Sequence, residues 1–128
     1  MKHKFAVFID RDGTIIEDVD NLSKIEDLEI FPLAIKAVKL LNKYKVPAII
    51  VTNQPVIARG WVDEQWLHNA HEKIIAKFNT GGAKIDRIYY CPHHSNANVE
   101  KYRAICECRK PGAGMLKQAS KDLNIDLE

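Results

Sequence analysis

Residues 5–14 read Phe-Ala-Val-Phe-Ile-Asp-Arg-Asp-Gly-Thr, an apolar run that ends in two carboxylates and a glycine. Continuous apolar runs are typical of strands buried on both faces of a parallel sheet, so we predict a central strand over residues 4–10. Side chains two apart in extended backbone point to the same side. We therefore expect Asp10 and Asp12 together at the C-terminal end of this strand. There they can bind a divalent cation and divide the roles of nucleophile and acid/base.

The apolar pattern continues along the chain as alternating strands and helices. Further strands are predicted over residues 46–51 and 85–90, and helices over residues 32–44, 63–80 and 115–123. Loops are predicted over residues 13–30, 55–62 and 91–112. This order favours an α/β fold, a Rossmann-like parallel sheet with helices on both faces. Ligands of such sheets bind outside the C-terminal ends of the strands.

The bulk composition limits the class of protein. A chain of 128 residues is expected to form one domain, and a net charge of +2 gives no reason to expect nucleic acid or a membrane surface as partner. We see no membrane-spanning segment and no secretory signal, so a cytoplasmic location is expected. The small net charge also disfavours a zinc-binding nucleic-acid module.

Polar residues with a use in phosphate chemistry follow the first two strands. A carboxylate nucleophile can split phosphate ester hydrolysis into two steps through an aspartyl phosphate, with Mg²⁺ and a lysine to neutralise the phosphate oxygens. Thr52 and Asn53, at the end of the second strand, could hold the phosphoryl group. An isolated Asp-x-Asp is more often a turn or a helix cap. The position of this pair after a buried strand favours the catalytic interpretation.

Three cysteines lie close together in the segment after the third strand. Cys91, Cys106 and Cys108, with His93, offer four ligands in two close pairs, the pattern of a tetrahedral zinc site. A closed shell of four protein ligands predicts a structural zinc that fixes a long loop. Spacing alone leaves His94 open as an alternative to His93, and free thiols are the other interpretation.

Several short motifs together resemble a known superfamily. Residues 10–14, 52–54 and 110–111 resemble three motifs of the haloacid dehalogenase superfamily. Residues 57–60, 91–94 and 106–111 narrow the resemblance to its histidinol-phosphate and heptose bisphosphate phosphatases. The resemblance covers essentially the whole chain. It implies a Mg²⁺-dependent sugar-phosphate phosphatase of the haloacid dehalogenase fold, with a minimal cap and a zinc-stabilised loop.

The resemblance also implies a role for each matched residue. Asp10 would be the nucleophile and Asp12 the acid/base, and both would bind Mg²⁺, Asp12 through its backbone carbonyl. His93 is favoured over His94 as the zinc ligand. The expected ligands of the cleaved phosphate are Thr52, Asn53 and Lys110, and those of the rest of the substrate are Arg59 and Arg109. Among substrates, a heptose 1,7-bisphosphate of lipopolysaccharide or other glycan synthesis comes first, and histidinol phosphate is the alternative.

Two features depart from the family pattern. A fourth motif, an acidic pair after a further strand, is expected soon after residues 126–128, so the given sequence is predicted to be a truncated single phosphatase domain over residues 1–128. Without that strand, residues 4–10 would form an exposed apolar edge open to self-association, whereas the full-length protein is expected to be a monomer. We predict that these 128 residues alone are weakly active or an inactive zinc-binding domain. Pro55 and Val56 replace the small residues that relatives carry and could change the substrate loop.

Some conspicuous side chains are predicted to be structural. His3, His68 and His71 show no partner in the sequence and are interpreted as surface or helix residues. Trp66 and Phe78 fall on a helical apolar stripe and are expected in the core. Trp61 lies in a loop beside Arg59 and could touch substrate.

Overall fold

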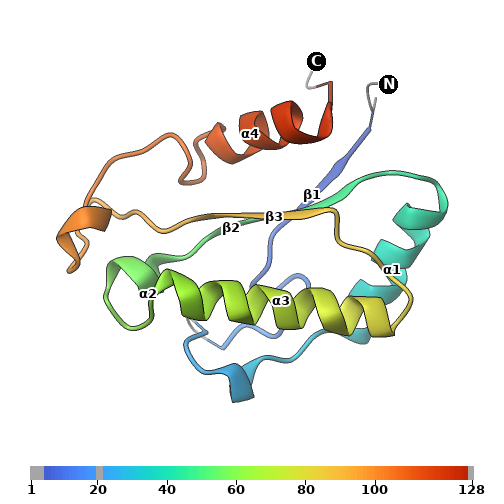
Figure 1. The fold of residues 1–128 in the computed structure, drawn as a ribbon, viewed down its shortest axis with the longest axis horizontal. Coiled ribbons are helices and arrows are strands. Elements are labelled where there is room, and N and C mark those ends of the chain that lie inside the picture. Colours follow the sequence, from blue (N-terminus) through green and yellow to red (C-terminus); the bar gives the residue numbers. More distant parts are fainter. Residues whose placement is uncertain (1–4, 20–21, 127–128) are drawn as a thin grey trace.

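The computed structural model describes residues 5–19 and 22–126, which form a three-layer α/β structure (Figure 1). Its strands are β1 (Val7–Ile9), β2 (Ala48–Asn53) and β3 (Arg87–Cys91). Its α-helices are α1 (Pro32–Lys43), α2 (Pro55–Ala58), α3 (Glu64–Thr80) and α4 (Gly114–Leu123). Two short 3₁₀ turns, η1 (Ile25–Asp27) and η2 (Glu100–Tyr102), interrupt the loops. The α/β class predicted from the sequence is confirmed.

The three strands are parallel and lie in the order β1-β2-β3. Val7 is in register with Ala48, and Asn53 is in register with Cys91. The connections between the strands are long crossovers that carry α1 and α3, as parallel pairing requires. The C-terminal ends of all three strands therefore meet at one edge of the sheet, which brings together the segments that begin at Asp10, Gln54 and Pro92.

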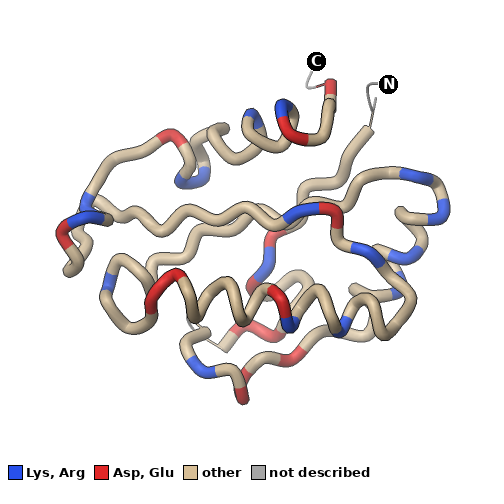
Figure 2. The backbone as a smooth tube through the Cα atoms, in the orientation of Figure 1, with Lys and Arg blue, Asp and Glu red and all other residues tan. Residues whose placement is uncertain are grey.

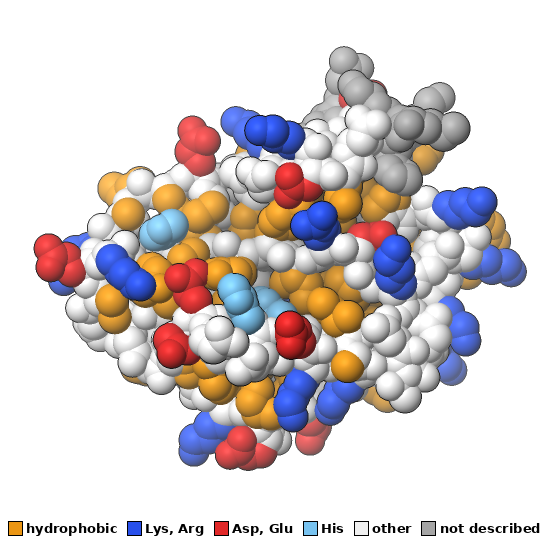
Figure 3. All heavy atoms as spheres, viewed as in Figure 1, with side chains coloured by type: hydrophobic (Ala, Val, Ile, Leu, Met, Phe, Trp, Pro, Cys, Tyr) orange, Lys and Arg blue, Asp and Glu red, His pale blue; other side chains and the backbone are white. Residues whose placement is uncertain are grey.

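Alternation along β2 builds one apolar core on each face of the sheet. Ala48 and Ile50 pack with α1 and α3, whereas Ile49 and Val51 pack with α4. Figure 1 shows α4 on one side of the sheet and α3 on the other. On the face drawn in Figure 3, apolar side chains form a band between these two helix layers. Because both faces are covered, β2 is buried along nearly its whole length, as its continuous apolar run predicts.

Helix ends follow local signals in the sequence. Asp63 accepts a hydrogen bond from the backbone N–H of Trp66 (2.8 Å) and so caps α3, as predicted. Gly81 follows the last residue of α3, also as predicted. Trp66 packs against the core, and Phe78 is fully buried within it.

Three local expectations were wrong. The predicted loop over residues 55–62 begins with the short helix α2, because Pro55 occupies the first helical position, where its missing N–H costs nothing. β1 begins at Val7 rather than Lys4, and Lys4 lies outside the described residues. The helix predicted over residues 32–44 ends at Lys43, and Tyr44 is its C-cap, with an exposed side chain.

β1 is an edge strand of the described sheet, and its flank is apolar. Phe5 is 76% exposed and Val7 is 37% exposed, which agrees with the predicted exposed edge. Figure 2 shows Lys and Arg interspersed with Asp and Glu over the elements. Within the described ranges, none of the helices combines the length and the apolar character that a membrane span requires.

Candidate active site and metal site

Asp10 and Lys110 meet at the C-terminal edge of the sheet. Lys110 Nζ donates to Asp10 Oδ1 at 2.9 Å and to the carbonyl oxygen of Val51 at 3.1 Å. The Asp10 side chain is 53% exposed, so this carboxylate is ion-paired and still open to solvent. The sequence predicted both residues for one site although they stand 100 positions apart.

Asn53 holds the backbone of Lys110 in place. Its Oδ1 accepts from the Lys110 backbone N–H at 2.9 Å, and its Nδ2 donates to the Lys110 carbonyl at 3.3 Å. This double contact fixes the loop after the cysteines against the end of β2. The Asn53 side chain thus orients the lysine, a role that the sequence pattern alone did not suggest.

Asp12 takes a different set of partners from Asp10. Arg11 Nη2 donates to both Asp12 oxygens, at 2.8 and 3.0 Å, and Arg11 Nε donates to Asp12 Oδ1 at 3.2 Å. Because β1 ends at Ile9, the strand alternation that would keep Asp10 and Asp12 on one side does not extend to them. One carboxylate pairs with Lys110 and the other with Arg11.

Gln54 connects this pair to Thr52. Its Nε2 donates to Asp12 Oδ2 (3.1 Å) and to Thr52 Oγ1 (2.7 Å), and its Oε1 accepts from Arg11 Nη2 (2.9 Å). Thr52 and Gln54 are almost fully buried. The predicted phosphate ligand Thr52 is therefore linked through one amide to the predicted acid/base.

His71 lies on helix α3, in line with its interpretation as a surface or helix residue, but it is buried and has a partner. It is 6% exposed, and its Nε2 lies 3.1 Å from Arg11 Nη1. Burial, followed by the charges of Arg11 and His68, lowers the pKa of His71 to about 3, so the ring is neutral and can accept from the guanidinium. His68 is exposed and contacts the Tyr90 hydroxyl at 3.0 Å, and His3 lies outside the described residues.

Sequence reasoning missed Arg11, Gln54 and His71 as members of the site, although a signal for His71 was present. Position 71 belongs to the buried stripe of α3, whose members are Leu67, Ala70, His71, Ile74 and Phe78. A histidine on such a stripe needs a polar partner because an unpaired buried group is costly. Arg11, between two acidic residues, offered the matching donor.

The four predicted zinc ligands converge in the segment after β3. The Sγ atoms of Cys91, Cys106 and Cys108 and the Nδ1 atom of His93 all lie within 4.8 Å of one another. His94 Nδ1 instead accepts from the backbone N–H of Asn96 at 3.0 Å, which favours His93 as the ligand. Three thiols and an imidazole suit zinc, so this cluster could bind that metal.

The thiols of this cluster differ in their ease of ionisation. Burial raises the pKa of Cys91 and of Cys108. Burial also acts to raise the pKa of Cys106, but hydrogen bonds with Cys108 and Cys91 outweigh it and lower the value to about 7. Binding of a metal must therefore release protons from Cys91 and Cys108.

A pair of tyrosines ties the cysteine segment to α3. The two carboxylate oxygens of Glu64 accept from the hydroxyls of Tyr90 (2.5 Å) and Tyr102 (2.7 Å). These hydrogen bonds lower the pKa of Glu64, so the carboxylate stays ionised. The segment is thus attached at Glu64 as well as at Asn53.

The two arginines expected to contact the rest of the substrate lie in different places. Arg109 Nη1 donates to the His93 carbonyl (3.4 Å), and Arg109 and Lys110 border the same cavity of about 330 Å³. The Arg59 guanidinium lies over the Trp61 ring, with its Cζ 5.2 Å from the centroid. The structure therefore brings Arg109, but not Arg59, next to the lysine in a shared cavity.

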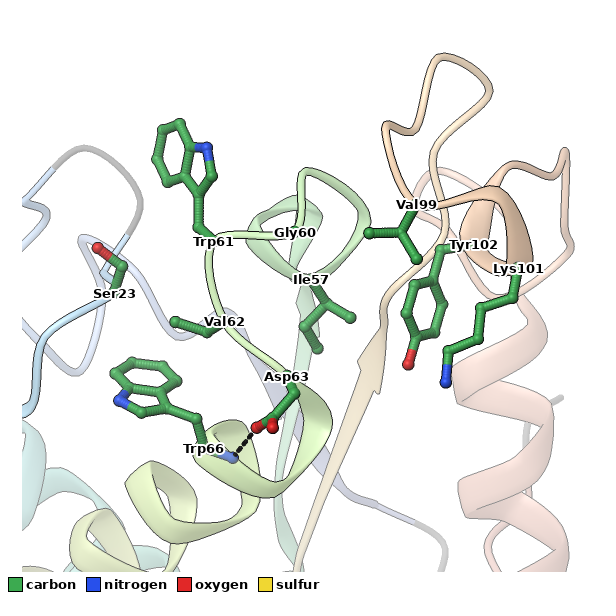
Figure 4. A pocket seen from close by; sticks show the side chains of 10 residues that line it. All are labelled: Ser23, Ile57, Gly60, Trp61, Val62, Asp63, Trp66, Val99, Lys101 and Tyr102. Atoms are coloured by element: carbon green, nitrogen blue, oxygen red, sulfur yellow. Dashed lines mark hydrogen bonds between the residues drawn. The ribbon is translucent and has the colours of Figure 1, made fainter.

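A cavity of about 670 Å³ lies on the side of Trp61 (Figure 4). Its walls come from α2 and the loop after it, from the start of α3, from η2 and from the loop that holds Ser23, and they include Trp61, Trp66, Lys101 and Tyr102. Figure 4 shows the two tryptophans on one side and Lys101 and Tyr102 on the other. None of the predicted catalytic, phosphate or metal residues lines this cavity. It is separate from the Asp10–Lys110 site.

Comparison with curated proteins gives consistent relatives, although no family model matches the chain. The D-glycero-beta-D-manno-heptose-1,7-bisphosphate 7-phosphatase of Photorhabdus laumondii is 42% identical over 122 residues, which are 95% of this chain and 65% of the relative. The protein of the same name from Haemophilus ducreyi is 43% identical over 124 residues, which are 96% of this chain and 68% of the relative. The chain thus spans about two thirds of the length of these relatives.

Solved structures show the same fold. A protein from Mesorhizobium loti, described as a HAD-like phosphatase, superimposes with a TM-score of 0.92 at 31% identity, over 99% of this chain and 61% of that one. The D,D-heptose 1,7-bisphosphate phosphatase of B. bronchiseptica, complexed with magnesium and phosphate, gives a TM-score of 0.82 at 28% identity. That alignment covers 98% of this chain and 66% of the other.

Proposed function

Because the chain belongs to the haloacid dehalogenase superfamily, in the family of the D-glycero-β-D-manno-heptose-1,7-bisphosphate 7-phosphatases, we propose that it provides the phosphoryl-transfer site of such an enzyme. The observation that carries this proposal is the contact between Lys110 Nζ and Asp10 Oδ1, with Asn53 clamping the lysine backbone. A solvent-open carboxylate next to a fixed cation can attack a phosphate that the cation has drawn in.

In the proposed reaction, a carboxylate oxygen of Asp10 attacks the phosphorus atom. A P–O bond to Asp10 forms, the P–O bond to the sugar oxygen breaks, and Asp12 gives its proton to that leaving oxygen. Asp12 then takes a proton from water, whose oxygen attacks the phosphorus and releases inorganic phosphate and free Asp10. Thr52 and Lys110 hold the phosphate oxygens throughout.

The proposed Mg²⁺ would be held by the Asp10 carboxylate and the Asp12 carbonyl. Oxygen donors of this kind suit a hard cation, and Asp10 is exposed enough to reach one. When bound, the ion would neutralise charge on the phosphate oxygens. The zinc in the cysteine cluster would have no chemical step, because its four protein ligands leave no open position.

For the substrate, we propose a heptose 1,7-bisphosphate, with the 7-phosphate at Asp10. Support comes from the names of the relatives, and from Arg109 beside Lys110, whose planar fork suits a second phosphate or sugar hydroxyls. Arg59 would need to leave the Trp61 ring to reach the same ligand. A small-molecule substrate and a cytoplasmic location stay predictions.

The test is phosphate release with Mg²⁺ from D-glycero-β-D-manno-heptose 1,7-bisphosphate and from histidinol phosphate. Both the 128-residue chain and a fusion to the remaining C-terminal part of the Photorhabdus relative would be assayed. We expect preference for the heptose and much faster turnover by the fusion. Asp10→Asn should lower kcat by at least about 10³-fold, since it removes the nucleophile.

Asp27→Asn is the matched control, because Asp27 is an exposed carboxylate in η1. It should leave turnover unchanged. Full activity of Asp10→Asn, or no phosphate release by either form from either substrate, would contradict the proposal. A preference for histidinol phosphate would contradict the proposed substrate but not the proposed reaction.

A further inference from the structure

All the buried polar side chains of the described residues gather around Asp12. They are Arg11, Thr52, Gln54 and His71, with exposed fractions from 0 to 6%. None of their buried nitrogen or oxygen atoms lacks a hydrogen-bond partner. Buried polar networks are costly unless complete, so a complete one fixes its members in a single arrangement.

The Arg11 guanidinium is the centre of this network. It is fully buried and is held on three sides, by Asp12 through Nε and Nη2, by Gln54 through Nη2 and by His71 through Nη1. The planar fork of arginine leaves one orientation that serves all three partners. Rotation of Asp12 would break its two-pronged contact with Nη2.

His71 is the member that comes from a different layer. It stands on α3, 60 residues along the chain from Arg11, whereas Gln54 directly follows β2. Its neutral ring offers Nε2 as an acceptor, and a protonated ring would set N–H against N–H. His71 therefore anchors the guanidinium to the helix layer below the sheet.

We propose that His71 is a positioning residue that, through Arg11, holds the Asp12 carboxylate in the orientation needed for proton transfer. This inference rests on the proposed function, because Asp12 transfers protons only in that reaction. His71 itself touches neither the substrate nor the reacting atoms. Its loss should lower kcat more than it changes KM, because substrate binding does not involve Asp12 reorientation.

The experiment compares His71→Phe with His71→Gln in the most active form of the enzyme. Phenylalanine keeps a ring but removes the acceptor, whereas glutamine returns an acceptor near the position of Nε2. We expect kcat to fall about 10- to 100-fold in His71→Phe with KM within about twofold, and to recover in large part in His71→Gln. The kinetic constants would be measured well below the melting temperature of each variant, so that unfolding does not affect them.

His68→Phe is the matched control, because His68 lies on the same helix, is exposed and contacts Tyr90 rather than Arg11. It should keep the kcat of the unchanged protein. Normal kcat in His71→Phe, together with an inactive Asp10→Asn, would overturn the inference and leave the proposed function standing. An active Asp10→Asn would instead refute the proposed function.

A second readout does not depend on enzymatic turnover. Nitrogen NMR of the 128-residue chain at pH 7 should show His71 neutral with the proton on Nδ1, and slowly exchanging guanidinium protons of Arg11. In His71→Phe those protons should exchange faster and the carboxylate carbon resonance of Asp12 should shift. A protonated Nε2, or Arg11 and Asp12 signals unchanged in His71→Phe, would overturn the inference.

Discussion

Arg11 and Cys91 both place buried polar atoms at the same edge of the sheet, yet these atoms are satisfied in different ways. The buried network around Arg11 is completed by the chain itself, with Asp12, Gln54 and His71 as partners. The cysteine cluster instead brings three thiols and an imidazole within 4.8 Å of one another, a set of groups that suits a metal ion.

We therefore expect the stability of the two regions to depend on different factors. The network joins residues that directly follow β1 and β2 to a residue of α3, so it is fixed as the core folds and depends on packing. A cluster of metal-type ligands in an irregular segment depends on an ion, because the free energy of metal binding stabilises the segment that carries the ligands. Lys110 is within two residues of Cys108 and next to Asp10 in space, so it is the point where the two regions meet.

Metal removal is the change with the largest expected effect. Cys108→Ser, or a strong chelator, should lower the melting temperature by about 10 °C or more, because several kcal/mol of metal binding stabilises the segment. Thermal unfolding followed by circular dichroism, with zinc quantified by mass spectrometry, measures this. His94→Asn is the control and should retain zinc. If the chelator lowered the melting temperature of Cys108→Ser as much as that of the unchanged chain, the cluster would not be the metal site.

Loss of the buried guanidinium comes next. Arg11→Met should lower the free energy of unfolding by about 2–4 kcal/mol, because it leaves Asp12, Gln54 and His71 without their common donor. Lys84→Met is the contrasting variant, since its contact with Asp86 is 3.9 Å long and Lys84 is 75% exposed. That change should cost less than about 0.5 kcal/mol in denaturant unfolding. Equal effects of the two variants would mean that the network is not a unit of stability.

The pH dependence of stability should show the smallest effect. The pKa of His71 lies near 3 in the folded chain and near 6.5 when unfolded, so the unfolded state takes up its proton first as the pH falls. The contribution of His71 to stability is therefore complete above about pH 6.5 and decreases by about 1 kcal/mol per pH unit as the pH falls toward 3.

Denaturant unfolding at pH 7 and pH 5 measures this slope. His71→Gln should lose less stability over that interval than the unchanged chain, by about 1–2 kcal/mol. His68→Gln, on the same helix but exposed, should keep the dependence of the unchanged chain. Identical slopes for His71→Gln and the unchanged chain would place His71 outside the buried network.

Local patterns in the sequence predicted the strands, the three longer helices, the pair of carboxylates and the cysteine cluster. The apolar run before Asp10 and the run of β2 predict buried parallel strands, because periodicity is a property of neighbouring residues. The cysteine spacing predicts the metal cluster because each pair of ligands is close in the sequence. The pairing of Lys110 with Asp10 came from resemblance to a family, since no local rule joins residues 100 positions apart.

The tertiary structure alone decided which side chains hold the Asp12 carboxylate. Arg11 meets His71 only because α3 packs against the sheet in one register, and Gln54 reaches Asp12 only because β2 lies beside β1. Likewise, Asn53 is predicted as a phosphate ligand, and the structure adds a second role, because its side chain holds the Lys110 backbone. Such contacts depend on how whole layers pack, so the sequence predicted which side chains gather at this edge of the sheet, and the packing specified their orientation.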